Sequence, residues 1–360
     1  MKNYIHGGDK YAFSRQASAQ CTLIDFSANT NPLGMPKKVK EAAINAIENS
    51  EYYPDPFCRK LTETIAKAES KKSGIKITED NIICGNGAAD LIFRSIYALN
   101  LKKILVAAPT FSEYENAAKE KNIEIEYYYL KEENEFNFTE EILDHITEDI
   151  DGIFLCNPNN PVGNLIDKKL LHKILNKAKN INAFLLLDEC FLELTGKEKE
   201  NSMISKLKDF DNLIIFKAFT KTYAMAGLRL GYILTGNLDV SDKIFNIGQP
   251  WSVSTPAQAA GIEAVSENAF LEKSVKYIKK QREILVDALE KEGFKVYNGM
   301  ANFIFFKGSK DLVKTMEKKG ILLRDCSNYK GLSEGYMRIA VRREEENREF
   351  IEKLKEVLCG

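Results

Sequence analysis

The amino-acid sequence predicts an α/β protein with two parts: a large domain with a mostly parallel seven-stranded sheet covered by helices on both faces, and a smaller α+β domain. Two observations indicate this fold class. Between residues 57 and 240, helical patterns alternate with apolar segments of strand length. After residue 245, a long helical stretch is followed by closely spaced strand-like runs. The seven strand-like segments of the large domain are 81–84, 103–107, 123–129, 152–156, 183–187, 212–216 and 230–234.

The order of these patterns divides the chain into three parts. Residues 1–35 form an N-terminal arm rich in Gly, Asn and Pro, with one strand-like run at 22–26. We expect this arm to pack on the small domain. The large domain is predicted over residues 36–245 and begins with an amphipathic helical pattern at 36–50. The small domain is predicted over residues 246–360.

The small domain has its own sequence of elements. Pro256 is typical of a helix start and Gly293 of a helix end, so one long helical stretch is expected between them. A helix is expected before the last two strands, and a terminal helix after them. The strand-like runs are 294–298, 302–306, 321–324 and 336–341.

Bulk properties exclude several classes of protein. The net charge of −1 gives no electrostatic reason to expect binding to nucleic acid or to an anionic membrane. The seven cysteines are scattered without a C-x-x-C pair or a histidine cluster, so neither a metal site nor a disulfide scaffold is expected. Cysteines in apolar runs, a polar N-terminus and the lack of a membrane-length apolar run favour a cytoplasmic protein.

The run Thr-Lys-Thr-Tyr-Ala-Met-Ala-Gly-Leu-Arg-Leu-Gly at 220–231 is the most informative segment. A lysine amine such as that of Lys221 can form a Schiff base with an aldehyde. Thr220 and Arg229 can hold a phosphate dianion through a neutral hydroxyl donor and a forked cation. A surface lysine in a loop is the alternative interpretation, and two further segments weigh against it.

Both segments are apolar runs that end in polar residues. The run 184–187 leads into Asp188, which is typical of a buried parallel strand with a carboxylate at its carboxyl end. Ligands bind at that edge of open α/β sheets, and a carboxylate there can keep a pyridine nitrogen protonated. The run 152–156 leads into a turn with two prolines, where Asn160 can donate to a cofactor oxygen and to a substrate carboxylate.

Taken in order, Asn160, Asp188, Lys221 and Arg229 resemble the fold-type I aminotransferase family, the pyridoxal-phosphate enzymes, over nearly the whole chain. The resemblance implies pyridoxal 5′-phosphate as cofactor, with Lys221 and Asp188 as catalytic residues. The segment Gly-Asn-Gly-Ala-Ala-Asp at 85–90 is similar to the family's phosphate cup, where backbone N–H groups at a helix start meet the anion. The cup residues are Gly87, Ala88 and Ala89.

Three further residues match the family pattern. Phe111 matches the aromatic residue that stacks on the cofactor ring. Tyr53 matches the tyrosine that reaches the cofactor phosphate of the neighbouring subunit, so the resemblance implies a homodimer with shared active sites. Arg338 matches the arginine that binds the substrate α-carboxylate. Phe191 and Ala218 depart from the pattern, because many relatives have tyrosine at the first position and often serine or threonine at the second.

Within the family, the segments 6–11, 248–254 and 324–332 resemble the threonine-phosphate decarboxylase branch, close kin of the histidinol-phosphate aminotransferases. The resemblance implies decarboxylation of L-threonine O-3-phosphate, and possible use of O-phosphoserine, to form the aminopropanol phosphate linker of cobalamin. His6 and Arg324 then become candidate ligands of the substrate phosphate, with Asn31 as a neighbouring contact.

Two alternatives stay open. A histidinol-phosphate aminotransferase would use Lys221 to remove the Cα proton, whereas a decarboxylase would release CO2 and return a proton to Cα. The sequence does not fix which Cα bond is broken, nor the choice between phosphothreonine and phosphoserine. A remote alternative is a non-catalytic domain of this fold that binds an effector, but the composition is not basic and no DNA-binding segment is evident.

Overall fold

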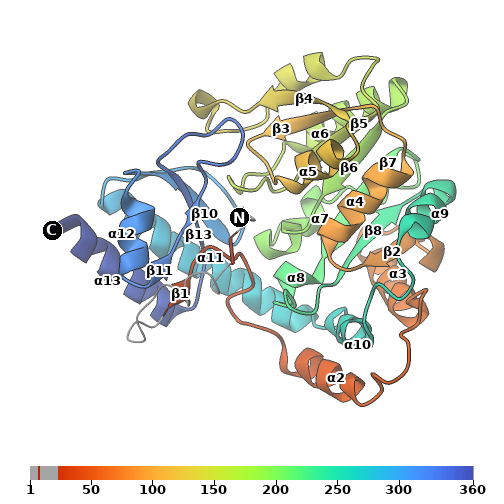
Figure 1. Ribbon diagram of the computed structural model, residues 1–360, viewed down its shortest axis with the longest axis horizontal. Helices are drawn as coiled ribbons and strands as arrows, with labels where there is room; N and C mark the ends of the chain where they lie inside the picture. Colours follow the sequence, from red (N-terminus) through yellow and green to blue (C-terminus); the bar gives the residue numbers. More distant parts are fainter. Residues whose placement is uncertain (1–6, 9–22, 360) are drawn as a thin grey trace.

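The computed structural model describes residues 7–8 and 23–359, and its centre is a seven-stranded sheet (Figure 1). The strand order is β2-β8-β7-β6-β5-β3-β4, and every strand except β8 runs in the same direction. The predicted fold class is thereby confirmed. The strands are β2 (Ile82–Gly85), β3 (Lys103–Ala108), β4 (Glu124–Tyr129), β5 (Gly152–Cys156), β6 (Phe184–Asp188), β7 (Leu213–Ala218) and β8 (Gly231–Thr235).

Helices cover both faces of this sheet because its strands bury side chains on both sides. In β3, Leu105 belongs to one core and its neighbours Ile104 and Val106 belong to the core on the opposite face. The first core includes side chains of α3 (Arg59–Ser73), α6 (Lys168–Asn180) and α10 (Thr255–Ala264). The second includes side chains of α4 (Ala88–Ala98), α5 (Glu113–Glu120) and α9 (Leu238–Ile247).

The small domain contains a four-stranded antiparallel sheet of order β12-β13-β10-β9. One face, with Ile304, Phe306 and Ile339, packs into a separate core with three helices. The opposite face, with Phe303 and Phe305, packs toward the large domain. The elements are α11 (Asn268–Lys291), β9 (Lys295–Val296), β10 (Phe303–Lys307), α12 (Leu312–Lys318), β11 (Ile321–Leu322), β12 (Arg324–Asp325), β13 (Tyr336–Ala340) and α13 (Glu344–Cys359).

The described part of the predicted arm runs along the small domain. Its strand β1 (Ile24–Asp25) pairs in parallel with β11, and Phe26 lies in the small-domain core (Figure 1). The Phe26 carbonyl accepts the N–H of Ala340, so the arm continues beside β13. The domain boundaries at residues 35 and 245 stay predictions.

Two local predictions for the small domain need correction. The stretch between Pro256 and Gly293 is not one helix, because residues 265–267 form a turn between α10 and α11. The predicted strand 321–324 is two short strands, of which β11 pairs with the arm and β12 pairs with β13. Local apolar patterning identifies such segments but does not specify their pairing partners.

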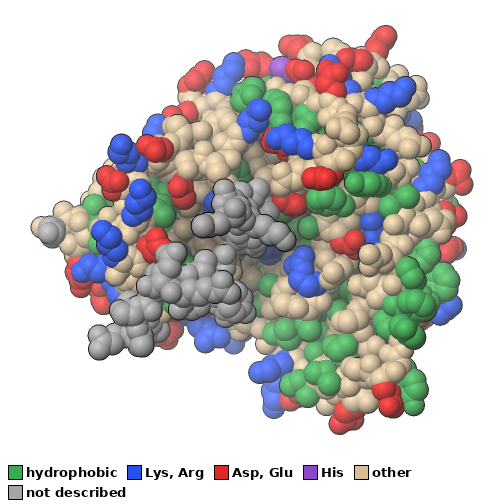
Figure 2. All heavy atoms as spheres, viewed as in Figure 1, with side chains coloured by type: hydrophobic (Ala, Val, Ile, Leu, Met, Phe, Trp, Pro, Cys, Tyr) green, Lys and Arg blue, Asp and Glu red, His purple; other side chains and the backbone are tan. Residues whose placement is uncertain are grey.

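A group of exposed hydrophobic side chains lies on α2 (Lys37–Ile47), the turn before α3, α9 and the connection to α10. Figure 2 shows hydrophobic side chains gathered on that side of the molecule. Tyr53 stacks on Trp251 with ring centroids 4.4 Å apart, and Phe57 stacks on Phe245 at 5.5 Å. The exposed residues of this patch are Ile44, Ile47, Tyr52, Tyr53, Phe57, Phe245, Ile247 and Trp251.

The described residues contain no helix long and apolar enough to cross a membrane. Five of the described cysteines are buried, Cys359 is exposed, and none of these six forms a disulfide. The cytoplasmic location stays a prediction.

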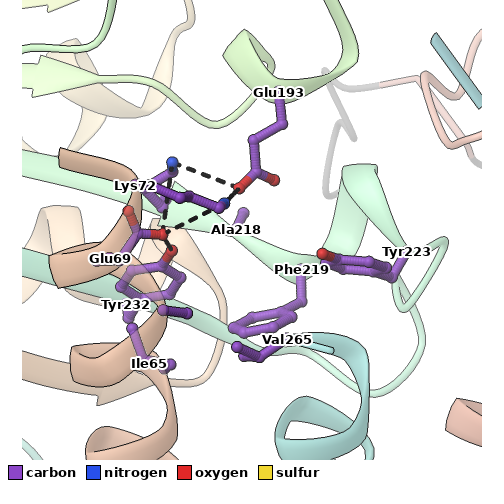
Figure 3. Close-up of a pocket in the computed structure, with 11 residues that line it drawn as sticks. Ile65, Glu69, Lys72, Glu193, Ala218, Phe219, Tyr223, Tyr232 and Val265 are labelled. Atoms are coloured by element: carbon purple, nitrogen blue, oxygen red, sulfur yellow. Dashed lines mark hydrogen bonds and ion pairs between the residues drawn. The ribbon is translucent and has the colours of Figure 1, made fainter. Parts of the chain in front are cut away.

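A buried ionic cluster anchors β7 on the face opposite α4. Lys217 lies 3.4 Å from Glu193 and 3.8 Å from Glu69, and it also pairs with Glu198. Figure 3 shows Lys72 near Glu69 and Glu193, with Tyr232 beside Glu69, and Lys72 also lies 3.4 Å from Glu198. Burial opposes the charge of Lys217, yet the three carboxylates raise its pKa well above the usual range. The ammonium groups of Lys217 and Lys72 therefore stay charged beside the carboxyl groups of Glu69, Glu193 and Glu198.

This cluster predicts a large and specific loss of stability when Lys217 is removed. Lys217→Met should lower the free energy of unfolding by about 3–5 kcal/mol, because it leaves buried carboxylates without their partner. Lys217→Arg keeps the charge and should be much less costly. Urea unfolding of both variants measures the difference, and a Lys217→Met variant within about 1 kcal/mol of the wild type would contradict this account.

Candidate active site

The predicted site residues follow four neighbouring strands at one edge of the sheet. Phe111 follows β3, Asn160 follows β5, Asp188 ends β6 and Lys221 follows β7, in the short helix α8 (Phe219–Thr222). Because parallel strands end at the same edge, the topology brings these four side chains together from positions up to 110 residues apart (221 − 111 = 110).

Lys221 lies at the centre of this edge with its amine over the ring of Phe191. The distance from Nζ to the ring centroid is 5.6 Å. Burial, followed by the nearby guanidinium groups of Arg338 and Arg229, lowers the pKa of Lys221 to about 8, against opposing effects of Cys190 and Asp188. The amine is therefore far more often neutral, and nucleophilic, than an ordinary lysine.

Asp188 is buried at the carboxyl end of β6 and held by two donors. Its Oδ2 accepts the hydroxyl of Tyr114 at 2.6 Å, and its Oδ1 accepts the N–H of Cys190 at 2.9 Å. Tyr114 was not predicted as a functional residue. Its signal in the sequence was a large aromatic residue on an otherwise polar helix, three positions after Phe111, which it contacts edge-on at 5.7 Å.

The loop between β2 and α4 forms a close cradle with Arg229. Gly87 has a φ of 84°, and a Cβ at this position would lie 2.5 Å from an Nη atom of Arg229. Arg229 is exposed, and it approaches the backbone carbonyls of Asn86 and Ala226 at 3.5 and 3.4 Å. The cation therefore lies over the start of α4, where Ala88 and Ala89 begin the helix. Thr220 is buried in α8, next to Lys221 in sequence.

Arg338 is the buried point at which three parts of the chain meet. Its guanidinium donates to Asn160 Oδ1 in the large domain and, at 2.8 Å, to the Ser27 carbonyl in the arm. With the Asn29 amide turned so that its oxygen faces this group, Asn29 accepts from it at 3.1 and 3.2 Å. The guanidinium carbon of Arg338 lies over the Phe303 ring, 5.3 Å from the ring centroid. Asn29 was not predicted to contribute to the site.

Arg324 lies directly opposite Arg338 in the antiparallel pair β12–β13. Side chains opposite each other in such a pair share one face of the sheet, so both arginines are on the face directed at the large domain. Arg324 donates to Asn328 at 2.9 Å and lies over the ring of Tyr329 at 5.1 Å. The neighbouring segment holds its guanidinium in place.

The remaining predicted ligands have different environments. The amide of Asn31 donates at 2.8 Å both to the Thr222 carbonyl and to Ser274 Oγ, so in this structure it fixes the arm beside α8, and its substrate contact stays a prediction. Tyr53 is 78% exposed, and its contact with another subunit stays a prediction.

His6 lies outside the described residues. The neighbouring residues Gly7 and Gly8 lie against Ser27, whose carbonyl binds Arg338. Gly8 donates to Ser27 Oγ at 2.7 Å, and a Cβ on Gly7 would be 2.3 Å from the Ser27 carbonyl oxygen. Gly7 is therefore a position where only glycine fits without displacing the arm.

Comparisons with known proteins agree with this geometry. The family model for aminotransferase class I and II matches residues 22–354. The chain is 32% identical to a threonine-phosphate decarboxylase from Salmonella typhimurium, covering 99% of this chain and 98% of that protein. It is similar to the crystal structure of a histidinol-phosphate aminotransferase from Clostridium acetobutylicum, with 32% identity, a TM-score of 0.86 and coverage of 94% and 99%. An L-threonine-O-3-phosphate decarboxylase from Porphyromonas gingivalis superimposes with a TM-score of 0.79 at 26% identity, covering 93% of this chain and 99% of that one.

The lowered pKa of Lys221 predicts how fast the protein captures an aldehyde at different pH values. Only the neutral amine attacks, so adduct formation with pyridoxal 5′-phosphate should accelerate as pH rises through about 8 and level off above it. Borohydride trapping after addition of pyridoxal 5′-phosphate, with peptide mapping, measures the rate at Lys221. Lys221→Ala should show no adduct at this position, and a rate that keeps rising toward pH 10.4, as for ordinary lysine, would contradict the assignment.

Proposed function

This chain belongs to the class I and II aminotransferase family, and on that basis we propose that it is a pyridoxal 5′-phosphate enzyme that decarboxylates L-threonine O-3-phosphate. The similar proteins are decarboxylases and aminotransferases by name, so the chain is an enzyme of one of these two kinds. Proteins of both kinds are at least 32% identical to this chain, so identity alone does not decide between them. The choice between them rests on the substrate side of the site.

The residues present fit the proposed cofactor. Lys221 supplies an amine with a lowered pKa for the aldehyde, and Asp188 supplies a buried carboxylate for a protonated ring nitrogen. The cradle at Gly87, with Arg229 above it and the N-terminus of α4 behind it, has the charge and the exposed N–H groups that a phosphate needs. We propose that Phe111 stacks on the cofactor ring and that Asn160 donates to its ring oxygen.

The side chains divide the work of catalysis. When bound, pyridoxal phosphate supplies an aldehyde and a ring that accepts the electron pair of the broken Cα bond. Asp188, held by Tyr114, keeps the ring nitrogen protonated. Arg338 and Asn160 orient the substrate carboxylate, and Lys221 Nζ can carry a proton to Cα after CO2 has left. The Phe191 ring lies beside Nζ and brings no hydroxyl group to the site.

The observation that carries the substrate proposal is the pairing of Arg324 with Arg338 on one face of the small sheet. O-phosphothreonine presents a carboxylate and a phosphate at once, so one molecule can occupy both guanidinium groups. Histidinol phosphate has a phosphate but no carboxylate. In an aminotransferase, it would bind the arginines in one half-reaction, and the amino acid that exchanges the amino group would bind them in the other. We propose His6 as a further phosphate ligand, since Gly7 lies against the Ser27 carbonyl that binds Arg338.

The assay that tests this proposal uses O-phospho-L-threonine without any keto acid. The decarboxylase should release CO2 over many turnovers, whereas an aminotransferase would stop after one half-reaction.

Arg324→Ala should lower kcat/KM about 10- to 100-fold, because the phosphate loses a charge-assisted partner, with little change in cofactor affinity. Lys310→Ala, which removes an exposed cation of the small domain 4.0 Å from Glu334, is the matched control. Reaction of histidinol phosphate with 2-oxoglutarate, without CO2 release from phosphothreonine, would reverse the assignment.

We further propose that the active enzyme is a homodimer. Tyr53 is mostly exposed and stacks on Trp251 within the hydrophobic patch on α2, α9 and the turn before α3, so a second copy is the partner that would cover both. Ile47→Glu in this patch should weaken association and lower activity in proportion to the monomer fraction. Sedimentation and activity measured over the same dilution series check this prediction, and full activity in a monomer would refute it.

A further inference from the structure

We propose that residues 131–138 of the large domain, called here the interdomain segment, position Asn160 and Arg338 and so determine how the substrate carboxylate is held. This inference rests on the function proposed above and extends it to residues that do not touch the substrate. Three sets of contacts support it. Glu132 binds side chains of the small sheet, Phe136 packs among aromatic side chains of the small domain, and Asn164 links the segment to the turn that bears Asn160.

The first contact is made by Glu132, which accepts from four side chains of the small domain. The hydroxyls of Tyr297 and Tyr336 donate to it at 2.6 Å each, and the ammonium groups of Lys307 and Lys295 approach at 3.0 and 3.1 Å. The two hydroxyls, followed by the two lysines, hold the pKa of Glu132 well below its usual range. The carboxylate therefore stays charged and bound throughout the neutral pH range.

The second contact is made by Phe136, which is buried against three rings of the small domain. It meets Tyr297, Phe305 and Tyr336 edge-on, with centroids 5.1, 5.6 and 5.8 Å away. Its φ of 54° is unusual for phenylalanine, and Glu135 before it has the same φ. Two successive left-handed residues are retained where the surroundings hold them, and here they direct the ring into the small domain.

The third contact joins the interdomain segment to the turn at residues 157–163. The Asn164 amide donates to the Phe136 carbonyl at 2.8 Å and to Asn137 Oδ1 at 2.9 Å. The Asn164 carbonyl accepts the N–H of Asn159 at 2.9 Å, so the same residue closes the turn that presents Asn160. Displacement of the interdomain segment therefore moves the large-domain partner of Arg338.

The pairing of strands in the small sheet means that displacement of the interdomain segment also moves Arg338. Lys307 is directly opposite Tyr336, and Phe305 is directly opposite Arg338. Residues two apart in a strand share one face, so the side chains held by Glu132 and Phe136 are the immediate neighbours of Arg338 on its own face. One segment thus fixes both members of the Arg338–Asn160 pair.

The expected consequence concerns reaction specificity. The orientation of the carboxylate determines whether the Cα–carboxylate bond or the Cα–H bond is aligned for cleavage on the cofactor. If the Arg338–Asn160 pair is held less firmly, CO2 release should fall. The share of turnovers that end in the amine form of the cofactor should then rise. Asp188, Lys221 and Arg229 belong to the large domain, and the contacts described above for them involve other residues than the interdomain segment, so cofactor binding should be unaffected.

The test uses two variants of the full-length holoenzyme and one control. Glu132→Gln keeps the shape of a half-exposed side chain but removes its charge, and Phe136→Leu keeps the site apolar but removes the ring contacts. Glu141→Gln breaks the exposed pair that Lys131, in the same segment, forms with Glu141 at 2.9 Å, without touching the small sheet. The measurements are KM and kcat for phosphothreonine, the ratio of CO2 to pyridoxamine phosphate, and amide hydrogen exchange by mass spectrometry.

Both variants should lower kcat/KM about ten- to hundredfold and decrease the ratio of CO2 to pyridoxamine phosphate, with wild-type cofactor affinity. Amides at 159–164 and 336–340 should exchange faster, and those in β6 and β7 should not. Glu141→Gln should match the wild type. Unchanged exchange at 159–164 and 336–340 in both variants, or equally faster exchange throughout the chain, would overturn the proposal. Hydrogen exchange needs no substrate, so failure of the inference and failure of the proposed reaction remain distinguishable.

Discussion

The buried guanidinium of Arg338 is the interaction on which the arrangement of this protein depends. A desolvated cation must be surrounded by acceptors, and the acceptors here come from two other parts of the chain. Asn160 belongs to the turn after β5, Ser27 and Asn29 belong to the arm, and the arginine itself belongs to β13. The large domain, the small domain and the arm are therefore held together at the place where a substrate carboxylate would bind.

Burial and the same crowding of cations govern the chemistry of Lys221. Burial is the largest cause of its lowered pKa, and Arg338 and Arg229 further disfavour a charged amine. A buried site rich in positive charge thus keeps its lysine nucleophilic. The substitution of phenylalanine for the tyrosine found in many relatives works in the same direction, because it removes a hydroxyl and leaves an apolar surface.

Much of the large domain could be predicted from local patterning. Apolar runs such as 184–187 ending in Asp188 identify buried strands and the edge where ligands bind, because strand burial and chain direction are both visible in one segment. Local patterning could not predict which side chains that are distant in sequence contact each other. Asn29, Tyr114 and Glu132 became evident only through side chains 309, 74 and up to 204 residues away (338 − 29 = 309; 188 − 114 = 74; 336 − 132 = 204). The division of 321–324 into two strands has the same cause, since pairing is a non-local choice.

The reversed direction of β8 has a consequence for the evolution and assembly of the site. Because β8 begins at the edge where β7 ends, the chain passes from Lys221 to Arg229 in a short connection, without crossing the sheet. The groups proposed for the aldehyde and for the phosphate of the cofactor are thus tethered by eight residue steps (229 − 221 = 8). Closing so short a loop costs little entropy, so this half of the site can form as one local unit early in folding. The fixed tether also limits variation, since an insertion or deletion between these residues would change the span to which a single ligand must fit.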